Sequence, residues 1–189
     1  MGKRINRKGK KAVLHYVTIN IRDHVPIFQY DIYVCAALEQ LRLHCDEHPA
    51  KLVAYVGMPE HFHFINNPLD GDIVKFLSQF KPAVTNAVAE IAERLGHTKL
   101  LHWLMTAEGH NQLWQEGKHD LFLWSDWMIW QKINYIHDNP RRRKLVKRAI
   151  DYRYSSFAAV YDVPTAPIIP VDGEWWWDDL PLDLEEEEY

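Results

Sequence analysis

Residues 51–65 read KLVAYVGMPEHFHFI, and this stretch predicts two neighbouring strands joined by a bend. Residues 51–56 form a short apolar run, and residues 61–65 alternate between two kinds of side chain, which is typical of a strand. Residues 58–60, Met-Pro-Glu, are predicted to form the bend. The rest of the fold can be placed outward from this pair of strands.

The segments on both sides of the pair predict further strands and helices. Residues 13–21 are β-branched and alternating, which indicates a strand. Residues 31–48 show helical spacing of apolar residues before Pro49. Residues 72–95 predict a long helix with Gly96 as its stop, and Pro82 is expected to kink or split that helix. The predicted order up to residue 95 is therefore strand, helix, two strands and helix.

The last predicted elements complete an α+β pattern. Residues 118–123 predict a fourth strand, and Ser125 suits the N-cap of a helix that runs to about Asp138 and ends at Asn139-Pro140. The order β-α-β-β-α-β followed by a helix is typical of the ferredoxin-like fold, an antiparallel sheet with helices packed on one face. We expect a basic arm at 1–12, a folded domain at 13–163, and a C-terminal extension at 164–189 that holds four prolines and an acidic run.

Length and composition are those of one globular domain. The chain has 189 residues, of which 47% are hydrophobic. No stretch is long and apolar enough to span a bilayer, and the basic N-terminus lacks the apolar segment of a secretory signal. Cys35 and Cys45 lie about 15 Å apart on one predicted helix, too far for a disulfide. We expect a cytoplasmic protein without a membrane partner.

Charge is distributed unevenly along the chain. Nine of the 26 acidic residues, but none of the 22 Lys and Arg residues, lie in residues 172–189, so the net charge of −4 hides a mildly basic body. Basic clusters near the N-terminus and in residues 141–148 suit a phosphate backbone, although each could also be a solvated surface run. The predicted DNA contacts are Lys8, Lys10, Lys11, Arg141, Arg142, Arg143, Lys144 and Arg148.

His61 and His63 are candidate metal ligands. Residues i and i+2 of a strand share a face, so both imidazoles converge while Phe62 points to the other side. Neutral imidazole is a common ligand of divalent metals. The alternative is a pair of surface histidines, because one such pattern among eleven histidines is a weak signal.

Tyr135 and Asn139 are candidate partners of the two histidines. They stand at i and i+4 in the segment YIHDNP, residues 135–140, which places them on one side of a helical turn. A phenol oxygen can attack phosphorus when a metal polarises the phosphate. Asn139 could add an oxygen ligand. The alternatives are an ordinary helix tyrosine and a helix-stop asparagine.

Four segments together resemble a known family. The stretch from Met58 to Phe64 is similar to the M-P-N/E-H-x-H pattern of HUH single-strand nucleases of the insertion-sequence class, and residues 135–140 are similar to their Y-I-H-x-N-P block. Residues 114–120, WQEGKHD, resemble the family's W-Q-x-G-x-H-D segment. Residues 152–156, YRYSS, resemble its Y-x-x-S-S segment. The resemblance covers roughly residues 13–160 and points to the REP-associated tyrosine transposases.

This resemblance implies a ferredoxin-like nuclease and strand transferase. His61, His63 and Asn139 would bind Mg²⁺ or Mn²⁺, and Tyr135 would form a 5′-phosphotyrosine with single-stranded DNA. The DNA would carry short hairpins such as repetitive extragenic palindromes, the protein would associate with the nucleoid, and it would act as a monomer or a homodimer. The cofactor and substrate follow from the resemblance, not from the residue spacing.

The sequence leaves the roles of several residues near these segments undecided. Glu60 replaces the commoner Asn and could approach the metal or orient a water, or it could be a solvent-facing bend residue. His119 and Asp120 could support the site or contact DNA, or simply begin a strand. Trp124 stands where relatives often carry Arg, which puts the preferred DNA sequence in doubt.

Three other functions compete with the transferase. The chain could be a hairpin-binding protein derived from a transposase without catalysis, a metal hydrolase that uses activated water, or a small-ligand domain on the same fold. The presence of both histidines, Tyr135 and Asn139 together argues against the non-catalytic alternative.

Overall fold

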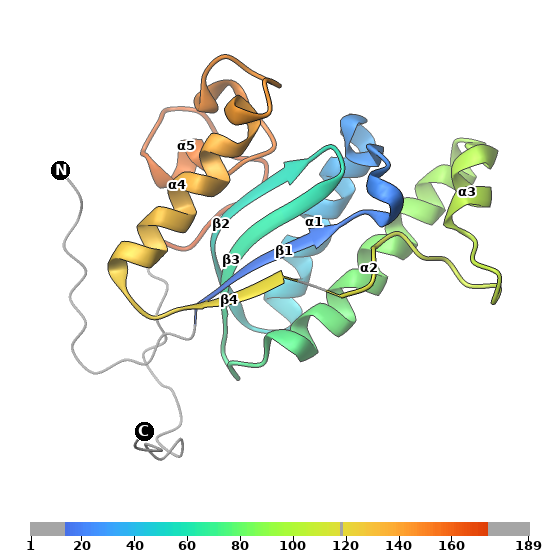
Figure 1. Ribbon diagram of the computed structural model, residues 1–189, viewed down its shortest axis with the longest axis horizontal. Helices are drawn as coiled ribbons and strands as arrows, with labels where there is room; N and C mark the ends of the chain where they lie inside the picture. The colour runs from blue at the N-terminus through green and yellow to red at the C-terminus, as the bar shows by residue number, and fades with distance from the viewer. Residues whose placement is uncertain (1–13, 118, 174–189) are drawn as a thin grey trace.

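The computed structural model describes residues 14–117 and 119–173 (Figure 1). The basic arm predicted at residues 1–12, with Lys8, Lys10 and Lys11, lies outside the described residues. The same holds for residues 174–189 of the predicted extension. Within the described part of the chain, no helix is long and apolar enough to cross a membrane.

Four antiparallel strands form one sheet in the order β2-β3-β1-β4. The strands are β1 (Leu14–Asn20), β2 (Ala50–Met58), β3 (His61–Pro68) and β4 (His119–Leu123). Helix α1 (Asp31–Glu47) connects β1 to β2, and α2 (Ile73–Arg94) follows β3. This order confirms the predicted α+β, ferredoxin-like arrangement.

A third long helix, α4 (Asp126–Arg142), follows β4, and the remaining elements are short. The short elements are η1 (Arg22–His24), η2 (Ile27–Gln29), α3 (Thr98–Leu104), η3 (Ala149–Asp151) and α5 (Phe157–Val160). The sequence patterns did not predict α3.

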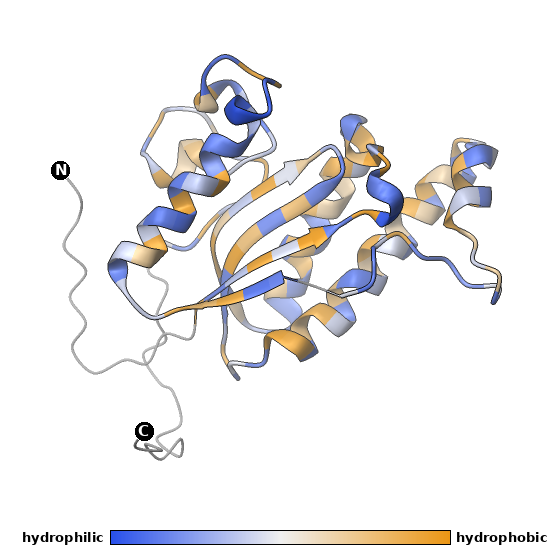
Figure 2. Ribbon diagram, in the orientation of Figure 1, coloured by the Kyte–Doolittle hydropathy of each residue, from blue (hydrophilic) through white to orange (hydrophobic). Residues whose placement is uncertain are grey.

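One face of the sheet packs on α1 and α2. Alternate residues of β1 and β3 point to this face and are completely or almost completely buried, as expected for period-two alternation. They include Val17, Ile19, Phe62 and Phe64, which share one cluster with Val34, Leu38, Phe76, Phe80 and Val84 of the two helices. Figure 2 shows the matching alternation of hydrophobic and hydrophilic residues along the strands and around the helices.

The opposite face packs on α4. Tyr16, Val56 and Ile65 of the sheet contact a stripe of Ile129, Ile133 and Ile136 on that helix. The prediction of helices on one face is therefore confirmed for α1 and α2, and α4 adds a layer on the other face (Figure 1). This second layer places the end of α4 over the residues of β3 that carry the two histidines.

Two prolines act differently from their predicted roles. Pro82 was expected to kink or split the second helix, but α2 is assigned as one helix from Ile73 to Arg94. Proline removes one backbone hydrogen bond, and burial of Phe80 and Val84 on the core face outweighs that loss. Pro140 was expected to lie beyond the end of its helix, yet α4 continues to Arg142. Pro140 has no N–H to donate to the Ile136 carbonyl, and the helix end is completed by bonds from Arg143 N to Asn139 O and from Leu145 N to Pro140 O.

Residues 164–173 of the predicted extension pack against β2. The Tyr55 hydroxyl donates to the Ile169 carbonyl (3.1 Å), and Ile169 is only 1% exposed. Asp172 N donates to Leu52 O at 2.7 Å, and Leu52 N donates to the Asp172 carboxylate at 2.8 Å. The packed body thus continues past residue 163.

Candidate active site

His61 and His63 lie side by side on the α4 face of the sheet. In the pairing of β3 with β1, His61 lies opposite Asn20 and His63 lies opposite Thr18. Phe62, between the two histidines, points into the core on the other face of the sheet. The two imidazole centroids are 4.6 Å apart, and the residues are 7% and 4% exposed. The predicted convergence of the two histidines is therefore present in the fold, but the pair is buried, unlike two surface histidines.

The hydrogen bonds of His63 fix which nitrogen carries the proton. Asn139 Nδ2 donates to His63 Nε2 at 2.9 Å, so Nε2 holds the lone pair. Nδ1 then donates to Thr18 Oγ1 at 2.8 Å, and the Tyr16 hydroxyl lies 3.1 Å from the same nitrogen. Metal-binding histidines commonly have one nitrogen held by a second group, as Thr18 holds Nδ1 here, and Nε2, which accepts from Asn139, is the nitrogen that carries a lone pair for ligation.

Burial keeps both imidazoles neutral. It lowers the pKa of His63 to about 3, and the nearby charges of His61 and Lys132 act in the same direction. Burial also lowers the pKa of His61, although Glu60 opposes this effect. Neutral imidazoles are the form that binds a metal.

Asn139 gives this pair a third donor. It sits in α4 and is 7% exposed, with its amide directed at His63. Rotating the amide by 180° would place Asn139 Oδ1 where Nδ2 now lies. The lone pairs of Oδ1 and of His63 Nε2 would then both be available to one cation. Two imidazole nitrogens and one amide oxygen fit a divalent cation such as Mn²⁺ or Mg²⁺ that keeps waters or phosphate oxygens in its other positions.

Glu60 links His61 to a basic residue after α4. Its Oε1 accepts from Arg143 at 2.5 Å and lies 3.2 Å from His61 Nδ1. The carboxylate thus orients His61 from the side as Thr18 orients His63. The Glu60 side chain is only 13% exposed, so it faces His61 and Arg143 more than solvent.

Tyr135 stands next to the histidines. Its ring centroid lies 5.7 Å from that of His63 and 6.2 Å from that of Tyr16. Two cations flank the ring, Lys132 Nζ at 5.6 Å and the Arg142 guanidinium at 5.4 Å. The residue is 37% exposed, so solvent reaches the side chain.

The predicted DNA-binding residues in 141–148 differ in the side chains that they contact. Arg141 and Arg148 pair with exposed Asp138 and Asp151, at 2.6 and 2.5 Å. Arg143 binds Glu60, and Arg142 lies over Tyr135. Lys144 is exposed just after α4, at a backbone φ of +60°. Arg142 is therefore the member of the cluster nearest the candidate nucleophile.

His119 and Asp120 lie on opposite faces of β4. The His119 ring is 6.4 Å from Tyr16, and its charge acts on His63. Asp120 pairs with Val17 in the sheet register and hydrogen-bonds His15 at 3.0 Å on the α1–α2 face. Only His119 of this predicted pair borders the histidine site.

Sequence reasoning missed Tyr16, Thr18 and Lys132. Tyr16 and Thr18 occupy the same face of β1, opposite His63 in the register Thr18↔His63. Lys132 precedes Tyr135 by one helical turn, and its Nζ lies 4.7 Å from the centre of the Tyr16 ring. The i, i+3 spacing on α4 was a readable signal for Lys132, whereas the β1 pair needed the strand register.

The arrangement of elements is shared with a solved transposase structure. The four-stranded antiparallel sheet with helices on its two faces defines an α+β fold of the ferredoxin-like class. A solved REP-associated tyrosine transposase, bound to a REP hairpin, superposes with a TM-score of 0.59 at 20% identity and covers 94% of this chain and 93% of its own. The chain therefore has the fold of that transposase.

Other comparisons add little. A candidate transposase from Deinococcus radiodurans R1 superposes with a TM-score of 0.44 at 16% identity, over 72% of this chain and 97% of its own. No family model matches the chain, and no curated protein matches it. The fold alone does not assign an activity to this chain, so the site residues must indicate it.

Proposed function

We propose that this protein is a metal-dependent, transposase-like nuclease that cuts and rejoins single-stranded DNA through Tyr135. The observation that carries the proposal is the position of Tyr135 beside His63, whose Nε2 faces Asn139. A tyrosine nucleophile next to a buried, neutral, three-donor site is the constellation that phosphodiester transfer needs.

The reaction forms one ester and breaks another. The Tyr135 oxygen attacks the phosphorus, the bond from phosphorus to O3′ breaks, and the leaving oxygen takes a proton to become a 3′-hydroxyl. The phenol proton leaves to solvent, which reaches this side chain. The phosphate remains on the protein as a 5′-phosphotyrosine, and attack by a 3′-hydroxyl reverses the step. The total number of phosphodiester bonds is kept, so no nucleotide cofactor is needed.

His61, His63 and Asn139 would hold the divalent cation. When bound, Mg²⁺ or Mn²⁺ supplies Lewis acidity to the scissile phosphate. Thr18 and Glu60 keep the imidazoles in place from behind, through the 2.8 Å and 3.2 Å contacts at the two Nδ1 atoms. The protein's own contribution is therefore a fixed ligand geometry and a nucleophile held one helical turn from Asn139.

Positive charge around Tyr135 supports a DNA substrate. Lys132 and Arg142 flank the phenol, and Arg143 lies beside Glu60. These cations suit the backbone of a strand whose phosphate must reach the phenol oxygen. The solved transposase of the same fold was bound to a REP hairpin. We therefore infer that hairpin-flanked single strands are the substrate class here.

Covalent capture tests the proposal. Protein and labelled hairpin DNA from the flanks of its gene would be incubated with Mn²⁺ or Mg²⁺ and separated on a denaturing gel. A band of protein joined to DNA is expected, which disappears with a chelator and with Tyr135→Phe. Tyr161→Phe is the matched control, because Tyr161 bonds Asn134 on the same helix without approaching His63.

Two other results would redirect the assignment. Hairpin binding without cleavage in either metal would indicate a non-catalytic DNA-binding protein derived from a transposase. Cleavage that survives Tyr135→Phe would indicate hydrolysis by activated water, with the tyrosine as a bystander.

A further inference from the structure

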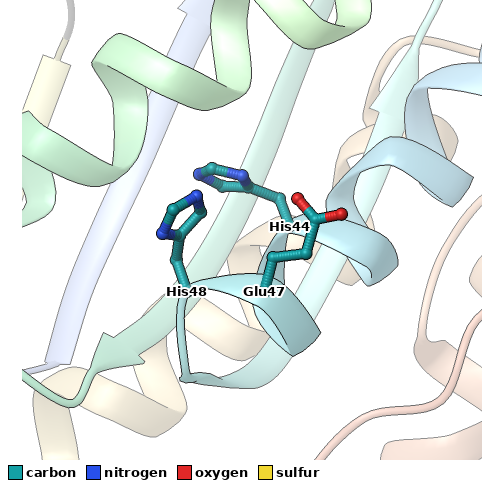
Figure 3. Close-up of side chains that lie close together, drawn as sticks. All are labelled: His44, Glu47 and His48. Atoms are coloured by element: carbon teal, nitrogen blue, oxygen red, sulfur yellow. The ribbon is translucent and has the colours of Figure 1, made fainter.

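A second group of metal-binding side chains lies at the end of α1. His44, Glu47 and His48 each offer one ligand atom, and these atoms all lie within 4.8 Å of one another (Figure 3). The spacing i, i+3 and i+4 brings three helix residues to one side. Helix α1 covers the face of the sheet opposite His63, so this group is separate from the candidate active site.

The orientation of His44 leaves one nitrogen ready to ligate. The residue is 5% exposed, and its Nε2 donates to the Phe76 carbonyl of α2 at 3.0 Å. The Phe76 ring also packs on the imidazole, with centroids 4.5 Å apart. Nδ1 must then carry the lone pair, because a neutral imidazole has only one N–H. A backbone carbonyl that fixes the far nitrogen is the usual support of a metal-bound histidine.

His48 and Glu47 flank that ring. The His44 and His48 centroids are 4.5 Å apart, and Figure 3 shows the Glu47 carboxylate on the other side of the His44 ring. Two ligands of one Zn²⁺ lie at most roughly 4 Å apart, since each is about 2.0–2.2 Å from the ion. A small rotation of Glu47, which is exposed, closes the remaining gap.

We propose that His44, Glu47 and His48 form a Zn²⁺ site. Two imidazoles and one carboxylate are a zinc ligand set, and a pair of histidines at i and i+4 is the spacing by which helices bind zinc. The negative end of the α1 dipole favours a cation at this position. Water completes the tetrahedron from the solvent side.

Zinc at this site fastens the last turn of α1 to α2. His44 is already tied to Phe76, so ligation extends that link to Glu47 and His48, near the start of β2. Because the ligands converge only in the folded chain, zinc raises the unfolding temperature. The zinc site and the proposed DNA chemistry do not depend on each other.

Zinc titration in a variant without the other histidine pair tests the site. The full chain with His61→Ala and His63→Ala would be titrated with Zn²⁺ against a chromogenic chelator, and its unfolding temperature followed. One equivalent is expected to bind and to raise that temperature. Adding His48→Ala or Glu47→Ala is expected to weaken binding by about tenfold or more, because one of three protein ligands is lost.

His102→Ala is the matched control, since His102 is an exposed histidine in the last turn of α3. It should bind zinc as the parent does. The proposal is wrong if the parent binds no zinc, or if His48→Ala and His102→Ala bind it equally. His48 and Glu47 lie outside the apolar core, so their variants should fold, and circular dichroism would verify this.

Discussion

Strand β3 buries side chains on both faces of the sheet, but the two faces differ in their chemistry. On the α1–α2 face, Phe62 and Phe64 pack among aliphatic and aromatic side chains of the helices. On the α4 face, the alternating positions His61 and His63 are almost as buried, yet they are polar and meet Asn139. One strand thus supplies the core with every second residue and the candidate site with the others.

The difference shows what a buried polar site requires. An apolar face needs only close packing, whereas a buried imidazole is destabilising unless its nitrogens have partners. Both nitrogens of His63 have them, in Asn139 and Thr18. One face of the sheet therefore holds a buried, hydrogen-bonded polar network, and the other holds an apolar core.

The largest effects are expected from substitutions of two adjacent residues of β3, Phe62 and His63. Phe62→Ala should lower the free energy of unfolding by about 3–5 kcal/mol, because it empties a fully buried position. His63→Ala should lower it less, while covalent DNA capture falls by about 100-fold or more through loss of a ligand. Urea unfolding and the capture assay measure both quantities. A greater loss of stability for His63→Ala than for Phe62→Ala would contradict the assignment of Phe62 to the core and His63 to the site.

A smaller effect is expected where the apolar face is tightest. A Cβ on Gly57 would lie 2.7 Å from Val34 Cγ2 and 3.0 Å from Phe62 Cε2. Gly57→Ala should therefore destabilise the fold by about 1–3 kcal/mol through overpacking of α1 on the sheet. Gly173→Ala is the control, because nothing lies within 4 Å of its added Cβ. Equal unfolding midpoints for the two variants would contradict the assigned packing.

Thr18→Val tests the polar face without changing its shape. The variant removes the hydroxyl that holds His63 Nδ1 at 2.8 Å, and we expect Mn²⁺ affinity to fall by about tenfold. Thr18→Ser keeps the hydroxyl and should bind the metal nearly as the parent does. If Val and Ser variants bind Mn²⁺ alike in a calorimetric titration, Thr18 does not orient the ligand.

The smallest effect concerns DNA binding. Arg142 lies over Tyr135, whereas Arg148 pairs with Asp151 away from the ring. Arg142→Ala should weaken binding of a single-stranded hairpin by about threefold, since one phosphate-binding cation is lost, and Arg148→Ala should change it less. Fluorescence anisotropy at fixed salt measures both. A larger loss for Arg148→Ala would move the DNA path away from Tyr135.

Much of the fold could be read from local patterns. Alternation placed Phe62 opposite the histidines, and i, i+4 spacing placed Tyr135 and Asn139 on one side of α4, because strand and helix periods are fixed by the backbone. The end of α4 was predicted too early. A proline in a last turn removes a bond that tertiary packing can replace, so its local signal is weak.

Local sequence patterns could not predict the side chains that contact His63. Tyr16 and Thr18 meet His63 only through the β1–β3 register, which joins residues 45 or more positions apart. The ion pairs of Arg141 with Asp138 and of Arg148 with Asp151 differ from these contacts, because they join residues only three positions apart, a local spacing that the charge analysis overlooked.

The sequence by itself determined the order of strands and helices and the candidate residues for metal binding, attack on phosphate and DNA contact, since these follow from backbone periodicity and side-chain chemistry. Only the tertiary structure decided that α4 covers the second face of the sheet, that Asn139 and Tyr135 meet His63 there, and that Glu60 and Thr18 hold the imidazoles. These contacts join distant segments, and their geometry is set by packing of the whole domain.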